Sequence, residues 1–249
     1  MEEKRKIVAI GGGEIRNSET LDIDRRIVEL TGKSKPKALL IPTASGDPDG
    51  YVEIFNQVYG KKLGCETKCL KLIQNPPGYE EMSALTLDSD LIYVGGGNTY
   101  RMMKIWRRLG LDGVLREAAS RGIVLSGLSA GAICWFRFGH SDSRSFSGKS
   151  AWEYIRVSGL GFIDALYCPH YHAEKREASL SQVIVKRGGL AIACDNNVAV
   201  EIVGDTYRIL TSSENVRAYK IFKHKGEIVT EQLSRSKAYK PLESLLTKR

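Results

Sequence analysis

The most regular feature of the sequence is a series of short, continuous apolar runs separated by longer amphipathic stretches. Because these runs do not alternate between apolar and polar residues, they predict strands that are buried on both faces of a sheet. The predicted strands cover residues 6–12, 37–43, 69–73, 91–97, 122–127 and 189–195.

The stretches between these strands carry apolar residues three and four positions apart, which predicts amphipathic helices. The predicted helices cover residues 21–30, 51–63, 99–109 and 111–120. A chain that alternates between strand and helix folds through right-handed crossovers between parallel strands. We therefore expect an α/β fold, with a mainly parallel sheet and helices on both of its faces.

The pattern changes near the end of the chain. Apolar and polar residues alternate over residues 197–229, as they do in half-buried strands, and Gly204-Asp205 and Lys225-Gly226 are typical turn pairs. We expect antiparallel C-terminal strands that extend or cap the main sheet. The polar, Ser-rich stretch 140–152 is too short to link two domains and predicts a loop beside the site. We therefore predict a single α/β domain over residues 1–249.

Composition limits the class of protein. Hydrophobic residues make up 42% and charged residues 27% of the chain, which predicts a globular protein rather than a disordered one. The first residues pass from charges directly into a strand, without the apolar run of a signal peptide or membrane span, so we expect a cytoplasmic protein and no membrane partner. The net charge is +8, but the Lys and Arg residues are spread along the chain, so we expect no nucleic-acid partner.

The cysteines and glycine motifs argue against a bound cofactor. Five cysteines, mostly within apolar runs, predict reduced buried thiols rather than disulfides. They form no CxxC pair, and the two histidines of His-Tyr-His at 170–172 lack further ligands, so we expect no metal. The glycine triplets at 11–13 and 95–97 have neither dinucleotide-binding spacing nor a Walker lysine, and we expect no cofactor.

Residues 122–135, GIVLSGLSAGAICW, contain a predicted strand followed by G-x-S-x-G. This arrangement is typical of a nucleophile elbow, in which a sharp turn holds a serine in a strained conformation and the flanking glycines leave it unobstructed. The alternative is an ordinary turn packed with small residues. We predict that Ser129 is a nucleophile, and that the N–H of Ala130 is available to a developing oxyanion.

A glycine loop and a histidine supply candidate partners for this serine. Gly96 and Gly97 lie between a predicted strand and a helix that begins near Asn98, where backbone N–H groups can bind an anion. A serine at neutral pH also needs a base. Among His140, His170, His172 and His224, we favour His170, which follows a strand-like segment and Pro169. His172 is a candidate substrate contact, whereas His224 lies in a basic hairpin expected at the surface.

Three motifs in this order, VGGGNTY (94–100), GLSAGA (127–132) and CPHY (168–171), resemble those of the serine peptidase family of α-aspartyl dipeptidase (dipeptidase E) and cyanophycinase. The family motifs read GGGNT, G-x-SAGA and NPHF or DQHF. The resemblance extends from the first strand to about residue 203. It implies an α/β fold related to the class I glutamine amidotransferases, with a serine where those enzymes carry a cysteine.

The resemblance also implies roles for individual residues. Ser129 would be the nucleophile and His170 the general base, in a reaction that hydrolyses a small peptide, such as an Asp-Xaa dipeptide, through an acyl-enzyme. The oxyanion hole would comprise Gly96 or Gly97 together with Ala130. Arg176 would meet the carboxylate or backbone of the substrate. Asn98 and His172 are candidate substrate contacts from their positions next to the glycine loop and His170. The alternative for Arg176 is a solvated arginine at a helix start.

The third member of the triad departs from the family pattern. The family places an acid after the histidine, where this chain has Asn196. An amide can orient an imidazole, but it stabilises imidazolium less well than a carboxylate does. Asp195 and Asp142 are alternative partners for His170, and the sequence leaves the choice open.

The sequence therefore predicts a serine hydrolase, an exopeptidase or dipeptidase that acts on a small peptide. One alternative is an α/β-hydrolase-type esterase with the chain order Ser129, Asp195 and His224. Another is a non-catalytic member of the family that binds a peptide or a small acidic ligand. The resemblance is compatible with either a monomer or a homodimer.

Overall fold

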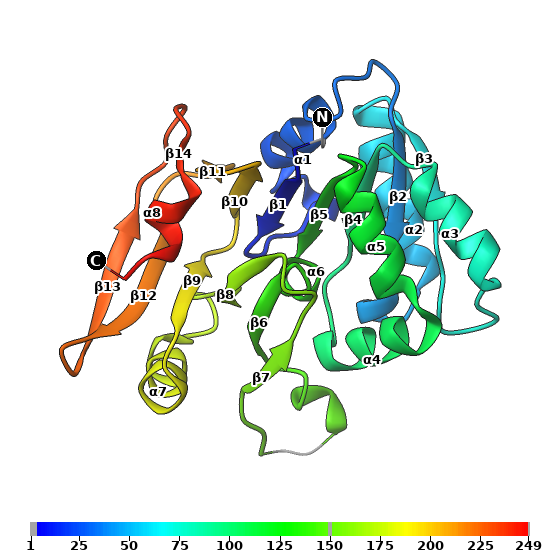
Figure 1. The fold of residues 1–249 in the computed structure, drawn as a ribbon. Coiled ribbons are helices and arrows are strands. Elements are labelled where there is room, and N and C mark those ends of the chain that lie inside the picture. Colours follow the sequence, from blue (N-terminus) through cyan, green and yellow to red (C-terminus); the bar gives the residue numbers. More distant parts are fainter. Residues whose placement is uncertain (1–3, 149–150, 249) are drawn as a thin grey trace.

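A computed structural model describes residues 4–148 and 151–248 (Figure 1). The strands of its first sheet are β1 (Lys6–Ile10), β2 (Lys37–Ile41), β3 (Glu66–Cys69), β4 (Leu91–Val94), β5 (Val124–Leu128), β10 (Val198–Val203), β11 (Thr206–Thr211) and β14 (Lys240–Pro241). They lie in the order β14-β11-β10-β1-β5-β4-β2-β3. The five strands from β1 to β3 in this order are parallel to their neighbours, and β10 joins β1 in antiparallel register.

A second sheet lies beside the first. Its strands are β6 (Phe136–Ser141), β7 (Ile155–Ser158), β8 (Ile163–Cys168), β9 (Leu190–Cys194), β12 (Ala218–His224) and β13 (Glu227–Leu233). They lie in the order β13-β12-β9-β8-β6-β7, and β8 is parallel to both β6 and β9. The hydroxyl of Tyr167 donates a hydrogen bond to the carbonyl of Ala9 over 3.0 Å, which ties β8 to β1.

Successive side chains of each strand point to opposite faces of the sheet, and helices pack against these apolar faces. The longer ones are α1 (Leu21–Glu29), α2 (Asp49–Phe55), the π-helix η3 (Asn56–Lys62), α3 (Tyr79–Leu87), α4 (Thr99–Leu109), α5 (Leu111–Ser120) and α7 (Glu177–Arg187). Short ones are α6 (Ala130–Ile133), α8 (Leu242–Leu246), η1 (Ile15–Asn17), η2 (Thr43–Ser45) and η4 (Ser145–Ser147).

These elements form successive layers around two apolar interfaces of the first sheet. In β1, Val8 and Ile10 pack with α1, α2 and η3, whereas Ile7 and Ala9 face the core shared with α4, α5 and the second sheet. Helix α7 packs on the other face of the second sheet. The carboxyl ends of β1, β4, β5, β8 and β9 carry the glycine-rich and polar motifs of the sequence, and in such folds ligands bind at these ends.

The predicted α/β class is confirmed, and so are helices 99–109 and 111–120 and the antiparallel C-terminal strands. One strand prediction was wrong in detail. Segment 69–73 is a strand only at its first residue, because β3 is a half-exposed edge strand without a continuous apolar run. Segment 189–195 is a strand as predicted, but it lies in the second sheet, which the sequence did not distinguish from the first. Among the helices of residues 4–148 and 151–248, none is both long and apolar enough to cross a membrane.

Candidate active site

Ser129 lies at the sharp turn between β5 and α6 in a backbone conformation that L-residues rarely adopt. Its φ of 55° and ψ of −111° fall outside the allowed regions, at a cost of about 1–3 kcal/mol. The surrounding hydrogen bonds hold this turn: its N–H donates to the carbonyl of Ile10 over 3.0 Å, and its carbonyl accepts from Ala132 and Ile133. The strain supports the elbow interpretation rather than an ordinary turn.

The two glycines of the elbow allow the backbone to pack more closely than any other residue would. A Cβ at Gly127 would lie 2.4 Å from the carbonyl oxygen of Gly131, and one at Gly131 would lie 2.1 Å from that of Val94. Both distances are far below van der Waals contact. The G-x-S-x-G spacing is therefore a packing requirement of this strand–turn–helix unit, as well as a means of leaving Ser129 unobstructed.

His170 reaches Ser129 from the end of β8. Its Nε2 lies 2.9 Å from Ser129 Oγ, and its Nδ1 lies 2.7 Å from Oδ1 of Asn196. An Nδ1–H that donates to Asn196 leaves Nε2 free to accept the serine proton. The backbone of His170 also has a positive φ of 51°, and its N–H donates to the carbonyl of Gly11 over 3.0 Å.

The structure brings only one of the three proposed orienting residues into hydrogen-bond contact with the ring of His170. Asn196 makes this contact. Asp195 instead accepts hydrogen bonds from the ring and backbone of His172 and from the N–H of Arg217. Asp142 makes no side-chain hydrogen bond within the described residues; burial raises its pKa and the nearby Arg176 opposes the rise.

Burial governs the protonation of His170. It lowers the pKa of the imidazole below its ordinary value, while the hydrogen bond to Asn196 and the charge of Glu174 raise it. The net direction is downward, so the ring is neutral at neutral pH. A neutral imidazole with Nε2 toward a serine can accept a proton from it.

The glycine triplet after β1 contributes to this site, although sequence reasoning gave it no role. A Cβ at Gly12 would lie 2.2 Å from Oδ1 of Asn196 and 2.4 Å from Cε1 of His170. The N–H of Asn197 donates to the carbonyl of Gly12 over 2.9 Å. The signal available in the sequence was a GGG triplet directly after a buried strand, at the sheet edge where the other motifs converge.

Backbone N–H groups are available next to Ser129. A Cβ at Gly96 would approach Ser129 Cβ to 3.4 Å, so the glycine loop borders the nucleophile directly. Within residues 4–148 and 151–248, the N–H groups of Gly97 and Ala130 donate to no protein acceptor. Ala130 begins α6, where the first N–H groups lack intrahelical partners. Such donors are what a developing oxyanion requires.

The proposed substrate contacts lie in different surroundings. Asn98 caps α4 by accepting from the N–H of Arg101 over 2.9 Å, and it donates to the carbonyl of Ser143 over 3.3 Å. Arg176 is not a solvated residue, because its side chain is only 1% exposed. It donates to Oε2 of Glu174 through Nε and Nη2, and to the carbonyl of His140 through Nη1.

The remaining histidines lie away from the serine. The Nδ1 of His172 faces Asp195 at 2.8 Å, and its Nε2 faces Glu177 at 3.7 Å. His224 ends β12 at an exposed position and pairs across the hairpin with Glu227, which contradicts the alternative in which it serves as the base. His140, the first residue of the stretch predicted to be a loop, instead lies buried in β6, and burial lowers its pKa to about 3. The described residues contain no cluster of three or more His, Cys, Asp or Glu suited to a metal ion.

A cavity of about 420 Å³ opens beside the nucleophile. Leu128 and Gly96 form the wall nearest Ser129, and Tyr51 and Ile54 supply apolar surface. Arg16 adds a cation to the lining. This volume lies within the range of about 300–1,000 Å³ that is typical of small-molecule sites.

Comparison with known proteins places this geometry in a family. The sequence profile of peptidase family S51 matches residues 7–210. The chain is 33% identical over 228 residues to the "Uncharacterized peptidase YgaJ" of Bacillus subtilis strain 168, covering 90% of this chain and 95% of that protein. It is 30% identical over 146 residues to the "Uncharacterized peptidase Lin0382" of Listeria innocua, covering 57% and 66%. A crystal structure of a peptidase from an acI-B1 Actinobacterium has the same fold, with a TM-score of 0.74 at 20% identity and coverage of 96% and 98%.

Proposed function

The chain belongs to peptidase family S51, and on this premise we propose that it is a serine exopeptidase that hydrolyses small peptides, Asp-Xaa dipeptides among them. The observation that carries the proposal is the relay from Ser129 Oγ through His170 to Asn196, with contacts of 2.9 and 2.7 Å. The strained turn directs the serine toward the glycine loop, where backbone donors are available.

In the proposed reaction, His170 Nε2 takes the proton from Ser129 as Oγ attacks the peptide carbonyl. The N–H groups of Ala130 and of Gly97 or Gly96 stabilise the oxyanion. His170 then returns the proton to the leaving amine, which leaves an acyl-enzyme. A water molecule, deprotonated by the same imidazole, hydrolyses this ester and restores Ser129.

The neutral Asn196 orients His170 but cannot neutralise an imidazolium as a carboxylate would. The acidic groups of Glu174 and Asp142 both raise the pKa of His170 at longer range, and Arg176 lowers it. The proposed enzyme therefore works with a base of lowered pKa, held in position by an uncharged partner.

The cavity beside Ser129 supports a short substrate with an acidic group. Its lining includes Glu14 and Arg16; the guanidinium of Arg16 forms no ion pair within the described residues, whereas Arg176 is already paired with Glu174. We assign to Arg16 the role of binding a substrate carboxylate, in place of a direct contact from Arg176. Asn98 would act by shaping the glycine loop, because both of its side-chain groups already bond to the protein.

A dipeptide library that includes Asp-Xaa peptides tests the proposal with wild-type protein and Ser129→Ala. We expect release of amino acids by the wild type and loss of at least about 10³-fold in the variant. Hydrolysis that survives Ser129→Ala would refute the assignment. Arg16→Gln should raise KM for Asp-Xaa peptides more than for Ala-Xaa peptides, and an equal effect on both would refute its role.

The neutral Asn196 also motivates a second candidate, a family member that binds peptides without cleaving them. The two candidate functions predict different reactivity of Ser129 in the intact protein. A catalytic Ser129 reacts covalently with a fluorophosphonate, whereas a pure binding protein retains affinity for a peptide but does not react. Absence of labelling, together with measurable peptide binding, would favour this second candidate.

A further inference from the structure

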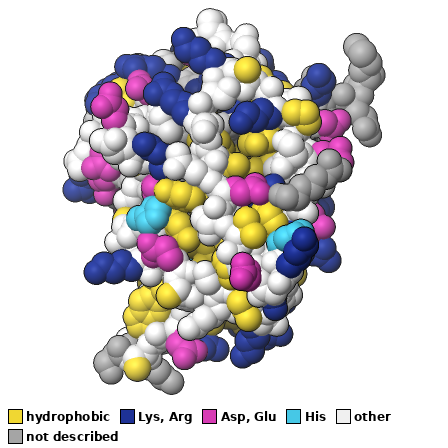
Figure 2. Space-filling model, turned by 90° about the vertical axis from the view of Figure 1, so that its left-hand side faces the viewer, with side chains coloured by type: hydrophobic (Ala, Val, Ile, Leu, Met, Phe, Trp, Pro, Cys, Tyr) yellow, Lys and Arg dark blue, Asp and Glu magenta, His cyan; other side chains and the backbone are white. Residues whose placement is uncertain are grey.

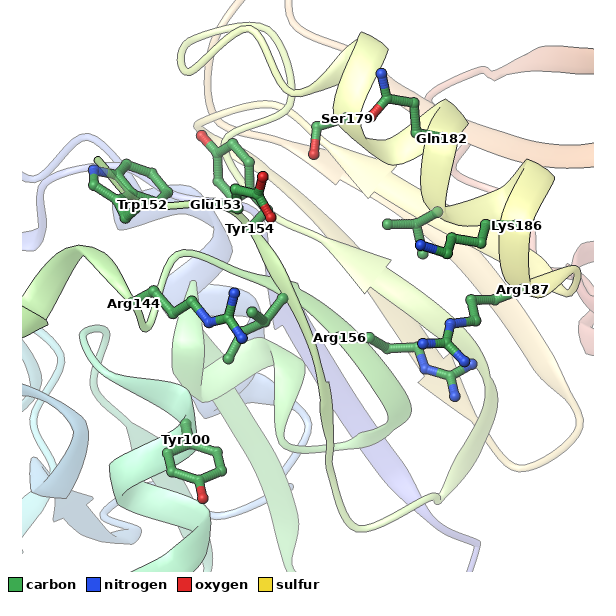
Figure 3. Close-up of a pocket in the computed structure, with 12 residues that line it drawn as sticks. Tyr100, Arg144, Trp152, Glu153, Tyr154, Arg156, Ser179, Gln182, Lys186 and Arg187 are labelled. Carbon is green, nitrogen blue, oxygen red and sulfur yellow. The ribbon is translucent and has the colours of Figure 1, made fainter.

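A second pocket, larger than the cavity beside Ser129, is lined in part by Tyr154. The proposed reaction uses none of the residues that line it. Its volume is about 960 Å³. Helix α4 contributes Tyr100, the loop before β7 contributes Arg144 and Trp152, and α7 contributes Ser179, Lys186 and Arg187 (Figure 3). This size is near the upper end of the range for small-ligand sites, so the pocket has room for several residues of a peptide.

The lining is strongly basic. The lining contains four cationic side chains, those of Arg144, Arg156, Lys186 and Arg187, and one carboxylate, that of Glu153. Within residues 4–148 and 151–248, none of the four cations forms an ion pair. Figure 3 shows Arg156 and Arg187 directed toward the same part of the pocket. Like charges gathered without partners repel one another, and an anionic ligand would relieve that repulsion.

Helix electrostatics account for only part of this cluster. Lys186 and Arg187 occupy the last turn of α7, where cations interact favourably with the helix dipole. No helix end explains Arg156, which lies in β7 and whose guanidinium carbon stacks 4.1 Å above the ring centroid of Phe138. The stacking holds this cation in place before a ligand arrives, which lowers the entropy cost of binding.

The basic lining continues beyond the pocket. A neighbouring cavity of about 320 Å³ shares Arg156, Arg187 and Val183 with it and adds Lys248. On the face seen in Figure 2, dark blue and magenta side chains are interspersed over the surface. In the pocket, by contrast, four cations share a lining with a single carboxylate.

A chain of direct contacts connects the pocket to the candidate active site. The ring of Tyr154, in the pocket wall, stacks on His140 at 4.4 Å, and the guanidinium carbon of Arg176 lies 4.7 Å from its centroid. The Tyr154 hydroxyl lies 3.4 Å from Oε2 of Glu174, whose N–H donates to the carbonyl of His170 over 3.0 Å. On the opposite side, Tyr100 lies in the first turn of α4, directly after the glycine loop.

From this placement, and resting on the proposed peptidase function, we infer that the pocket is a remote subsite for an acidic peptide segment of a longer substrate. Carboxylates distant from the scissile bond bind Arg144, Arg156 and Arg187, and Tyr100 and Trp152 pack against the peptide chain. Arginine is suited to such contacts because its planar guanidinium can bond a carboxylate through two parallel hydrogen bonds. The protein would then act on acidic oligopeptides in addition to dipeptides.

An acidic peptide fits these observations better than a nucleic acid does. Glu153 places a carboxylate in the same lining, which would repel a continuous phosphate backbone that ran along the pocket. A peptide can place an uncharged residue at that point. The pocket is also linked through Tyr154 and Glu174 to His170, which belongs to the centre proposed to cleave peptide bonds.

Binding is measured on Ser129→Ala, so that no cleavage is needed. The probe is a fluorescein-labelled octapeptide rich in Glu, with the Gln-rich counterpart as control, and affinity is read by anisotropy at two salt concentrations. We expect the Glu peptide to bind at least about tenfold more tightly, and salt to weaken it. Replacing Arg156 and Arg187 together by Gln should weaken the Glu peptide about tenfold. The matched control replaces two exposed lysines outside the pocket, Lys61 and Lys223, by Gln in the same way. It should leave the affinity for the Glu peptide unchanged.

Trp152 supplies a second readout that locates the ligand. It is 39% exposed in the pocket wall, whereas Trp106 and Trp135 are fully buried. The Glu peptide, in unlabelled form, should change tryptophan fluorescence in the parent protein but not in its Trp152→Phe variant. Equal binding of the two peptides, an equal loss in the lysine control, or tighter Arg156-dependent binding of a single-stranded oligonucleotide would each overturn the inference.

The outcomes separate this inference from the proposed function. In otherwise wild-type protein, the double arginine variant should raise KM for an acidic octapeptide substrate about tenfold and leave Asp-Xaa dipeptide hydrolysis unchanged. Glu-peptide binding without any Ser129-dependent cleavage would refute catalysis. Cleavage of short peptides with no effect of Arg156 and Arg187 would refute the subsite alone.

Discussion

Two histidines that are two residues apart, His170 and His172, have opposite surroundings. His170 is partly buried, with Ser129 on one ring nitrogen and the neutral Asn196 on the other. His172 is 47% exposed in its side chain, and both ring nitrogens face carboxylates, those of Asp195 and Glu177. The acid next to Asn196 in the sequence thus bonds the histidine that does not face the serine.

The difference shows that a shift of one residue along the backbone changes which histidine a side chain contacts. Asp195 and Asn196 follow β9, and their side chains bond different histidines of the segment after β8. The positive φ of His170 turns its side chain toward Ser129, while Tyr171 between the two histidines is buried in the core under α7. A carboxylate close in the sequence to a candidate catalytic histidine is therefore no guide to the partner of that histidine.

The largest expected effect separates the two histidines. His170→Ala removes the proposed general base and should lower kcat/KM by at least about 10³-fold, because general base catalysis contributes about 10²–10⁴-fold. His172→Ala should change it less than about threefold, since its ring does not reach Ser129. Both are measured with the best dipeptide substrate. Comparable losses of kcat/KM in the two variants would contradict the different roles assigned to His170 and His172.

Gly12→Ala should lower activity by disturbing His170 and Asn196, and it should not affect His172. The added Cβ would overlap Asn196 Oδ1 and His170 Cε1, and a displacement of this kind costs roughly 10²-fold in activity. Gly113→Ala is the matched control, because a Cβ there meets nothing within 4 Å. It lies in α5 and should raise stability by about 0.4–1 kcal/mol in a thermal or urea unfolding measurement. Full activity of Gly12→Ala would contradict the described contact.

Asn196→Ala removes the orienting hydrogen bond and should lower kcat by roughly 10- to 100-fold, less than loss of the base itself. Asp195→Asn keeps a hydrogen-bond acceptor for His172 and Arg217 and should stay within about threefold of wild type. The two variants are compared by steady-state kinetics after circular dichroism shows that both are folded. A greater loss in Asp195→Asn would assign the third position to Asp195.

The smallest effect is a shift in pH dependence. Burial lowers the pKa of His170 below its ordinary value, so the neutral, active form persists to lower pH and the acid limb of kcat/KM should lie below about pH 6.5. Asn196→Asp adds a charge that favours imidazolium, which should raise this pKa and move the acid limb upward by about one pH unit or more. If the acid limb of kcat/KM does not move, residue 196 does not face the group whose titration sets that limb.

Much of the fold could be predicted from the sequence, because buried parallel strands leave continuous apolar runs and amphipathic helices leave a helical period. The second sheet could not, since β6 and β7 have mixed burial and resemble loops in the sequence. The family motifs pointed to Ser129, His170 and the glycine loop, which the structure brings together. The partner of His170 depended on which neighbour faces the ring, and the contacts of Gly12 and the burial of Arg176 depended on close packing between distant segments.

The central claim is that Ser129 is activated by His170. It is tested most directly by labelling with a fluorophosphonate, followed by intact-mass measurement and peptide mapping of the wild type, His170→Ala and His172→Ala. The account predicts one label per chain on Ser129 in the wild type and in His172→Ala, and no label in His170→Ala. Labelling of Ser129 that persists at the wild-type rate in His170→Ala, or a label on another serine, would contradict it.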